Sequence, residues 1–254
     1  MKIVILGSGN VATHLAKSLY EKGDEIVQVF SPNLENAKLL ADKIGSRFTN
    51  HLNQVNHDAD LYIIAVKDDA IEAVAKGLTN VNGLVVHTSG TTDLKILSTL
   101  IKHSGVFYPL QTFSKDKDIV FDEIPICIEA ASEIQVNILT KLAKKISNQV
   151  YHLDGEKRKV LHLAAVFAGN FSNHLYTLAN QILKENNLDF NIIRPLIAET
   201  ADKVKKNLPE NVQTGPALRD DESTINKHLS MLTDLPELQK IYQTLSNSIK
   251  ITHK

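Results

Sequence analysis

The chain has 254 residues, a length that allows one large domain or two modest ones. Its 28 Lys and Arg residues are balanced by 29 Asp and Glu residues, so it lacks the basic excess that neutralises a nucleic-acid backbone, and we expect no nucleic-acid partner. The single cysteine, Cys127, excludes a disulfide within the chain, and the first hydrophobic stretch ends at Leu6, too short for a signal peptide or a membrane span; we therefore expect a cytoplasmic protein with no membrane partner.

Through roughly the first 150 residues, short β-branched runs alternate with longer amphipathic stretches, as in a parallel sheet that helices cover on both faces. The strands carry apolar residues on both faces, which is typical of the middle of a doubly wound sheet. The predicted strands are Lys2 to Leu6, Glu25 to Phe30, Leu61 to Val66, Leu84 to His87, Gly105 to Phe107, Ile124 to Ile128 and Gln149 to Leu153. The predicted helices among them are Val11 to Lys22, Leu34 to Ile44, Ala70 to Leu78 and Ser132 to Ile146. Cys127 lies inside an apolar run, which favours a small buried side chain over a nucleophile.

The pattern changes at residue 154, because no convincing strand follows. Glu156 to Asn186, Phe190 to Leu208 and Glu237 to Ile251 all have helical spacing. The sequence therefore predicts an α/β fold with a doubly wound, mostly parallel sheet in residues 1–153 and a second, all-α domain in residues 154–254. No long linker separates the two, so we expect them to pack tightly and to form a cleft.

The strongest local signal is the apolar strand that runs into Gly7-Ser8-Gly9-Asn10-Val11-Ala12 and then into a helix. Gly7 permits a tight turn, Gly9 lets a pyrophosphate approach the backbone, and Ala12 is small enough for close packing of the helix on the sheet. The amides around Asn10 and Val11 would face an anion at the positive end of the helix dipole. This context predicts a Rossmann domain that binds a nicotinamide dinucleotide through Gly7, Ser8, Gly9, Asn10 and Val11. The alternative is a glycine-rich turn with no ligand.

The choice of cofactor depends on the end of the second strand, where an acidic side chain would bind the ribose hydroxyls of NAD. Ser31 occupies this position, and Asp24 lies at the opposite end of the strand. A 2′-phosphate would meet no repulsion there and could take hydrogen bonds from Ser31 and Asn33, so the sequence favours NADP, with NAD still possible. No arginine follows the strand, and the nearest cations are Lys38 and Lys43. The alternative is that Ser31 only forms a turn before the next proline.

Three loops follow strands at the carboxyl edge of the predicted sheet, where ligands of open α/β sheets lie. We assign Val66 and Lys67 in the first loop, and Thr88 and Ser89 in the second, to the cofactor. The third loop, Phe107 to Phe113, combines aromatic residues, a proline and an amide. Structural alternatives remain for each: Asp68 or Asp69 caps the following helix, Thr88 and Ser89 cap a turn, and Tyr108 and Phe113 pack between the domains.

Polar side chains gather on one side of the predicted helix Glu156 to Asn186, at His162, Asn170 and His174. Their apolar neighbours suggest that much of this helix is buried, so the polar groups need partners in the protein or in a ligand. Histidine can release a proton near neutral pH, and we favour His162 as a catalytic residue with Asn170 as its hydrogen-bonding partner and His174 as a further candidate. The alternative for either histidine is a satisfied core residue. We predict no metal site, because the ligand spacing is poor.

Arg219 follows the Thr214-Gly215-Pro216 turn in the helical half. Its guanidinium could hold a substrate carboxylate or phosphate through two parallel hydrogen bonds, which makes Arg219 the last catalytic-site candidate. The alternative is a structural ion pair with Asp220 or Asp221.

Together these motifs resemble one family, the Rossmann-type NADP oxidoreductases whose helical C-terminal domain has no assigned function. The group is similar in its N-terminal half to pyrroline-5-carboxylate reductase, deazaflavin-dependent NADP oxidoreductase and the 6-phosphogluconate dehydrogenase superfamily. The resemblance extends from Met1 to about Leu232 and implies a dimer built through the helical domain. Tyr108 stands where the family pattern usually has a histidine, and Asp221 follows Asp220 where the usual pattern is Arg-Gly-Asp. The acid/base lysine of hydroxyacid dehydrogenases has no secure counterpart.

These observations lead to two functional hypotheses. The first is an NADP-dependent oxidoreductase that transfers hydride between the nicotinamide and a small carbonyl or imine compound in the interdomain cleft. The second is a dinucleotide-binding regulatory protein without hydride chemistry, because fold alone does not determine function.

Overall fold

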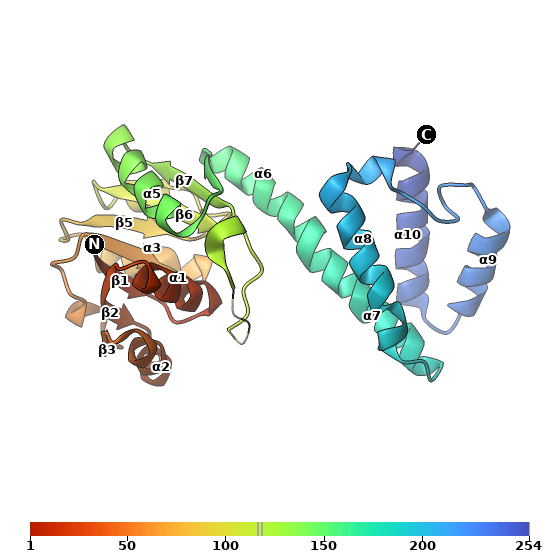
Figure 1. Cartoon of the computed structure of the whole chain (residues 1–254), viewed down its shortest axis with the longest axis horizontal. Helices are drawn as coiled ribbons and strands as arrows, with labels where there is room; N and C mark the ends of the chain where they lie inside the picture. The colour runs from red at the N-terminus through yellow and green to blue at the C-terminus, as the bar shows by residue number, and fades with distance from the viewer. Residues whose placement is uncertain (116, 118, 254) are drawn as a thin grey trace. The chain divides into compact units, whose positions relative to one another are not determined.

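The N-terminal half is built on one eight-stranded sheet, as the computed structural model of residues 1–115, 117 and 119–253 shows (Figure 1). The strand order is β3-β2-β1-β4-β5-β6-β7-β8, and every neighbouring pair is parallel except β6 and β7. The strands are β1 (Lys2–Leu6), β2 (Glu25–Phe30), β3 (Arg47–Thr49), β4 (Leu61–Ile64), β5 (Leu84–His87), β6 (Ser104–Pro109), β7 (Ile126–Ala130) and β8 (Val150–His152). The predicted doubly wound, mostly parallel Rossmann sheet is confirmed.

Helices cover both faces of this sheet and form a hydrophobic core on each. Side chains of β1 alternate between these two cores. Ile3 and Ile5 pack with α1 (Asn10–Glu21), α2 (Leu34–Ile44) and α5 (Glu133–Ile146). Val4 and Leu6 pack on the opposite face with α3 (Ile71–Lys76) and α4 (Lys95–Ser98). Each face is therefore closed to water, which explains why central strands such as β4 are apolar on both faces.

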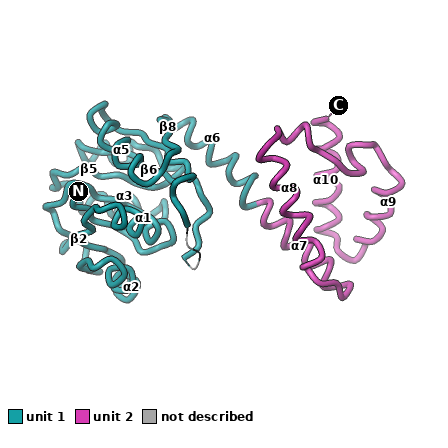
Figure 2. Tube along the Cα trace, viewed as in Figure 1, with its two compact units in different colours: residues 1–170 teal, residues 171–254 magenta. Residues whose placement is uncertain are grey.

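Beyond His152 the described residues form helices, turns and irregular segments, so the predicted all-α second half is confirmed. The elements are α6 (Gly155–Ala165), a π-helical segment (Val166–Phe171), α7 (Ser172–Glu185), α8 (Arg194–Lys206), α9 (Glu222–Met231) and α10 (Pro236–Thr252). By compactness the chain divides into residues 1–170 and 171–254 (Figure 2), since α6 and most of the π-helical segment group with the sheet.

One prediction about the second half was wrong. Much of the helix after residue 156 was expected to be buried, but only Arg158 is buried in α6, and α7 has no buried residue. Apolar side chains such as Leu163 and Phe167 are more than half exposed. Apolar spacing on a helix predicts a buried face, but several apolar side chains of this helix are exposed.

Cys127 is a buried free cysteine, as expected from its apolar run. Burial raises the pKa of its thiol to about 11, so the thiol stays protonated and unreactive at neutral pH. None of the helices in the described part of the chain is long and apolar enough to cross a membrane.

Candidate functional site

The turn between β1 and α1 leaves no room for a side chain at Gly7. This residue has a φ of +128°, and an added Cβ would lie 2.1 Å from the carbonyl oxygen of Ala65. Its amide donates to the carbonyl of Phe30 at 2.8 Å. Gly7 therefore lies at the carboxyl end of β1, between the ends of its neighbours β2 and β4, where the chain must turn tightly.

Gly9, unlike Gly7, has free space where a side chain would lie. A Cβ at Gly9 would meet no atom within 4 Å, and Gly9 begins α1 as an N-cap without a side-chain hydrogen bond. The first turn of α1 also contains no acidic residue. Free amides and a positive dipole end thus face an uncrowded space, which fits the diphosphate of a dinucleotide.

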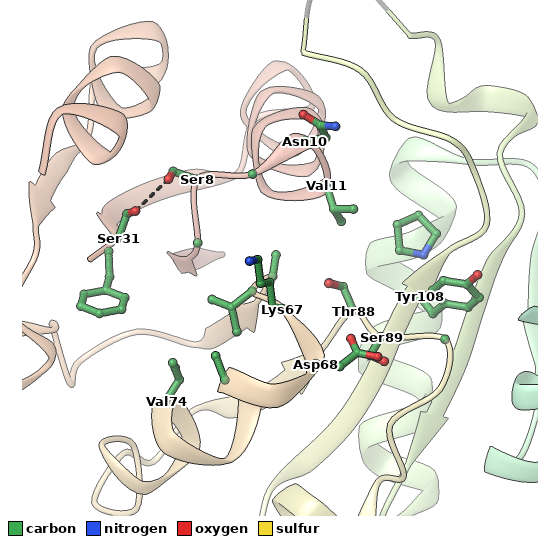
Figure 3. A pocket seen from close by; sticks show the side chains of 18 of the residues that line it. Ser8, Asn10, Val11, Ser31, Lys67, Asp68, Val74, Thr88, Ser89 and Tyr108 are labelled. Atoms are coloured by element: carbon green, nitrogen blue, oxygen red, sulfur yellow. Dashed lines mark hydrogen bonds between the residues drawn. The ribbon is translucent and has the colours of Figure 1, made fainter. Parts of the chain in front are cut away.

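A cavity of about 860 Å³ extends from this turn along the carboxyl edge of β1, β4 and β5 (Figure 3). This volume is in the range of small-molecule and cofactor sites, roughly 300–1,000 Å³. Most of the predicted cofactor residues line it: Gly7, Ser8, Gly9, Asn10, Val11, Ser31, Val66, Lys67, Thr88 and Ser89. One end is apolar, with Phe30, Leu52 and Val74.

Ser8 and Ser31 lie together at the β2 end of the cavity. Their hydroxyl oxygens are 2.8 Å apart, and both residues are buried (Figure 3). Asn33, the remaining predicted cofactor residue, does not line the cavity; it is the N-cap of α2, and its side-chain oxygen accepts from the amide of Asn36 at 3.0 Å. The structure therefore brings Ser31 to the cavity and places Asn33 at a helix start.

A separate small cavity of about 110 Å³ shares Ser8 with the large one. Lys43 of α2 and Lys115 of the loop after β6 line it. Asn10 and His14 hold this loop on α1. The side-chain amide of Asn10 donates to the carbonyl of Phe113 at 2.7 Å, and His14 Nε2 donates to the carbonyl of Ser114 at 2.8 Å. Neither lysine has a carboxylate partner among the described residues.

The loop after β5 is tightly organised around Ser89. The Ser89 hydroxyl accepts from the amides of Thr91 and Thr92 at 3.1 and 3.0 Å, so it stabilises a turn as well as lining the cavity. Asp68 accepts from the Thr91 hydroxyl at 2.5 Å. The alternative that Asp68 or Asp69 caps α3 was wrong, since the N-cap of α3 is Ala70, which has no side-chain cap.

His87, at the end of β5, is completely buried. Its Nδ1 accepts from the amide of Ser89 at 3.2 Å, whereas its Nε2 has no partner in the part of the chain that the structure describes. Burial, with a contribution from Arg158, lowers the pKa of His87 to about 4, so the ring is neutral at physiological pH.

Tyr108 and His162 meet at the opposite end of the large cavity from Ser31. The Tyr108 hydroxyl lies 3.0 Å from Nδ1 of His162, and both side chains line the cavity. An added Cβ at Gly90 would lie 2.6 Å from His162 Nδ1 and 2.8 Å from Tyr108 Cζ, so the pair fits only beside a glycine. Burial raises the pKa of Tyr108 to about 12, and the phenol keeps its proton at neutral pH.

Arg158 fixes the helix that carries His162. It lies one turn earlier on α6, is 0 % exposed, pairs with Glu129 of β7 and donates to the carbonyl of Thr92. These contacts join α6 to β7 and to the loop after β5.

The other predicted catalytic residues lie elsewhere. Asn170 is in the π-helical segment and lines a neighbouring cavity with His162, but Tyr108 is the hydrogen-bonding partner observed for His162. His174, on α7, and Arg219, before α9, belong to residues 171–254. Asp221 accepts from the backbone and side chain of Thr224, and no ion pair of Arg219 is found within the described residues. The same residues contain no group of three or more His, Cys, Asp or Glu side chains placed to hold a metal ion.

Sequence reasoning missed Arg158, Gly90 and the partnership of Tyr108 with His162. Arg158 had one usable signal: it precedes His162 by four residues, so both lie on one helix face. Nothing in the sequence pairs Tyr108 with His162, since they are 54 residues apart.

Two family models match the chain. Residues 2–89 match a model described as NADP oxidoreductase coenzyme F420-dependent, and residues 124–249 match a domain of unknown function (DUF2520). A comparison with curated proteins finds no match.

Solved structures show the same fold. A provisionally assigned NADP oxidoreductase from Bacteroides fragilis is 47% identical with a TM-score of 0.93, over 98% of this chain and 97% of that one. A protein from Thermotoga maritima is 24% identical with a TM-score of 0.76, over 99% and 98%. An imine reductase from Myxococcus stipitatus in complex with NADP+ is 14% identical with a TM-score of 0.67, over 98% and 92%.

Proposed function

This chain belongs to the family of the Bacteroides fragilis protein, NADP oxidoreductases that carry a DUF2520 domain, and on this premise we propose that it transfers hydride between NADP(H) and a small carbonyl or imine compound. One observation carries the proposal: the glycine turn and the Tyr108–His162 pair line the same cavity. A cofactor bound along that cavity would extend from the turn toward a side chain able to transfer a proton. A bound NADPH would supply the hydride.

His162 would supply the proton. In its cationic form, Nδ1–H donates to the Tyr108 oxygen, and the Nε2 proton is free to move to the oxygen or nitrogen of the substrate as the neighbouring carbon accepts hydride. Tyr108 keeps its own proton because of its raised pKa, so it orients the imidazole rather than donating to the substrate. The substrate would thus gain a hydride from the bound cofactor and a proton from His162.

NADP is favoured over NAD for two reasons. Among the described residues no carboxylate stands beside Ser31 to repel a 2′-phosphate, and Lys43 and Lys115 line the small cavity that adjoins Ser8. These lysines provide the cations that the sequence lacks directly after β2.

The proposal is tested in two steps. NADPH fluorescence on titration with protein measures cofactor binding, and NADPH oxidation is then followed with a panel of ketones, aldehydes and imines. We expect turnover of at least one compound, and we expect His162→Ala to lower kcat by about 100-fold or more while cofactor affinity is kept. Tyr108→Phe should lower kcat less, since the imidazole remains but loses its orienting contact.

Absence of NADPH and NADH binding at millimolar concentration would overturn the proposal. Tight NADPH binding without any turnover, together with an His162→Ala variant that behaves as wild type, would favour the regulatory hypothesis instead.

We further propose that residues 1–153 form the cofactor domain and residues 154–254 the substrate and dimerisation domain of a cytoplasmic homodimer. The support for dimerisation is the large apolar surface that α7 and α8 leave exposed, including Leu175, Ile182 and Leu196. Of the predicted catalytic residues, Asn170, His174 and Arg219 remain candidates for substrate contacts.

A further inference from the structure

A second cavity of about 470 Å³ adjoins the proton-donating end of the cofactor cavity. Both cavities are lined by Tyr108, Gln111 and His162, so they meet at the proposed proton donor. A substrate that receives hydride from the nicotinamide and a proton from His162 would lie in this second cavity.

The wall of the second cavity is formed by small residues on an irregular helix. Ala165 ends α6, and Ala168 and Gly169 belong to the π-helical segment Val166–Phe171. An added Cβ at Gly169 would lie 3.5 Å from Thr112 Cγ2, so Gly169 faces the opposite wall across little space. Single π-helical turns are rare and are often found at functional sites.

The second cavity is lined by uncharged polar and apolar groups and by one histidine. Its described lining contains no Lys, Arg, Asp or Glu; the polar groups are the hydroxyls of Tyr108 and Thr112, the amides of Gln111 and Asn170, and His162. The nearby cation, Arg158, is fully buried and engaged by Glu129 and Thr92, and it does not line the cavity.

These properties discriminate between substrates with and without an acidic group. An anionic carboxylate or phosphate would meet no permanent cation here, because the His162 imidazolium faces the reacting oxygen or nitrogen and loses its charge on proton transfer. Such an anion loses more hydration than neutral hydrogen bonds return. A carbonyl or imine needs only one or two hydrogen bonds, which Gln111 or His162 can make, and an apolar body fits the alanine and glycine wall.

We propose that the substrate is a small ketone or cyclic imine with an apolar body and no carboxylate or phosphate group. This inference rests on the proposed function and specifies its substrate class. It also removes the need for Arg219 to hold a carboxylate of the substrate.

Matched substrate pairs test the inference. Cyclohexanone is compared with 3-oxocyclohexane-1-carboxylate, and 1-pyrroline with 1-pyrroline-5-carboxylate, by kcat/KM with NADPH. We expect the uncharged member of each pair to be preferred by on the order of tenfold or more. A preference for the carboxylate member would overturn the inference.

A charge-introducing variant provides a gain-of-function test. Ala165→Lys places an ammonium in the cavity wall and should shift the preference toward the carboxylate members by about tenfold. Val160→Lys is the matched control, because Val160 lies on the same helix, is 68% exposed and does not line the cavity. An equal shift in both variants, or none in Ala165→Lys, would contradict the proposed location.

Binding measurements separate this inference from the proposed function. NADPH affinity is measured first, without substrate, and its absence would count against the function itself. With NADP+ bound, cyclohexanone should shift the amide NMR signals of Thr112 and Gly169, while its carboxylate analogue at equal concentration should not. If NADPH binds but cyclohexanone leaves both signals unmoved, the substrate site is wrong, whether or not any compound turns over.

Discussion

Gly7 and Gly9 are two residues apart, yet an added methyl group would meet opposite surroundings at these positions. At Gly7 it would overlap the Ala65 carbonyl in a backbone conformation that L-residues rarely adopt. We expect Gly7→Ala to lower the free energy of unfolding by at least about 1–3 kcal/mol in urea denaturation. At Gly9, where φ is −75°, alanine is compatible with the fold but its methyl enters the cofactor cavity.

Gly9→Ala is therefore the control for stability and the test for binding. It should unfold as wild type does, yet bind NADPH at least about tenfold more weakly, since the methyl obstructs the approach of the diphosphate. Equal NADPH affinity in Gly9→Ala and wild type would place the diphosphate elsewhere.

His87 makes the stability of the protein depend on pH. The native ring stays neutral down to about pH 4, while in the unfolded chain it takes up a proton below about pH 6.5. The unfolded state therefore binds more protons between these values, and stability should fall as pH is lowered from 6.5 to 4, by up to about 3 kcal/mol from this residue. Urea denaturation at several pH values measures the slope.

His87→Asn isolates this contribution, because an amide oxygen can still accept from Ser89 but does not titrate. The variant should lose most of the acid slope, whereas His57→Asn, at an exposed position, should keep it. An unchanged slope in His87→Asn would mean that other groups control acid stability.

At the scale of single residues, backbone requirements could be predicted and long-range partners could not. Gly7 and Gly9 were identified because a tight turn and an open anion site each need glycine within one short motif. Asn33 was placed at the cofactor because it follows β2, but its side chain caps α2 instead. Partnership between segments distant in the chain, as for Tyr108 and His162, depends on tertiary packing that a single sequence does not encode locally.

At the scale of elements, α6 depends on one ion pair. Arg158→Met would leave the carboxylate of Glu129 and the carbonyl of Thr92 without their partner, so we expect a loss of about 3 kcal/mol in unfolding free energy. Lys159→Met is the matched control, because Lys159 makes only exposed pairs with Glu156 and Asp93. Similar denaturation midpoints for the two variants would contradict the anchoring role of Arg158.

Several elements with a clear apolar pattern could be predicted from the sequence, whereas two short elements could not. The predicted ranges for β1, β2, β5 and α2 coincide with the structure. The three-residue edge strand β3 and the four-residue α4 were missed, because so few residues show no periodicity. The antiparallel direction of β7 was also not predictable, since strand direction depends on the path of the connection rather than on composition.

At the scale of the whole molecule, the exposed apolar side chains of residues 171–254 support the proposed dimer. We expect a homodimer, with twice the 28.2 kDa mass of one chain in light scattering after size exclusion. Leu196 of α8 has a side chain that is 65% exposed. Leu196→Glu should convert the dimer to a monomer, because a carboxylate at an apolar interface loses its hydration. Glu199→Gln, on the same helix, should leave the dimer intact. A monomeric wild type at micromolar concentration would contradict dimerisation.

The π-helical segment Val166–Phe171 is in effect an α-helix with one residue too many. Deleting Ala168 would let the backbone return to regular spacing, and the helix itself would gain stability. The deletion would also rotate the following side chains by about 100° around the axis, so the alanine and glycine wall would no longer face one space. The free energy of unfolding should then rise while the affinity for substrate falls, as expected where an irregular helix that lowers stability is maintained by selection for activity.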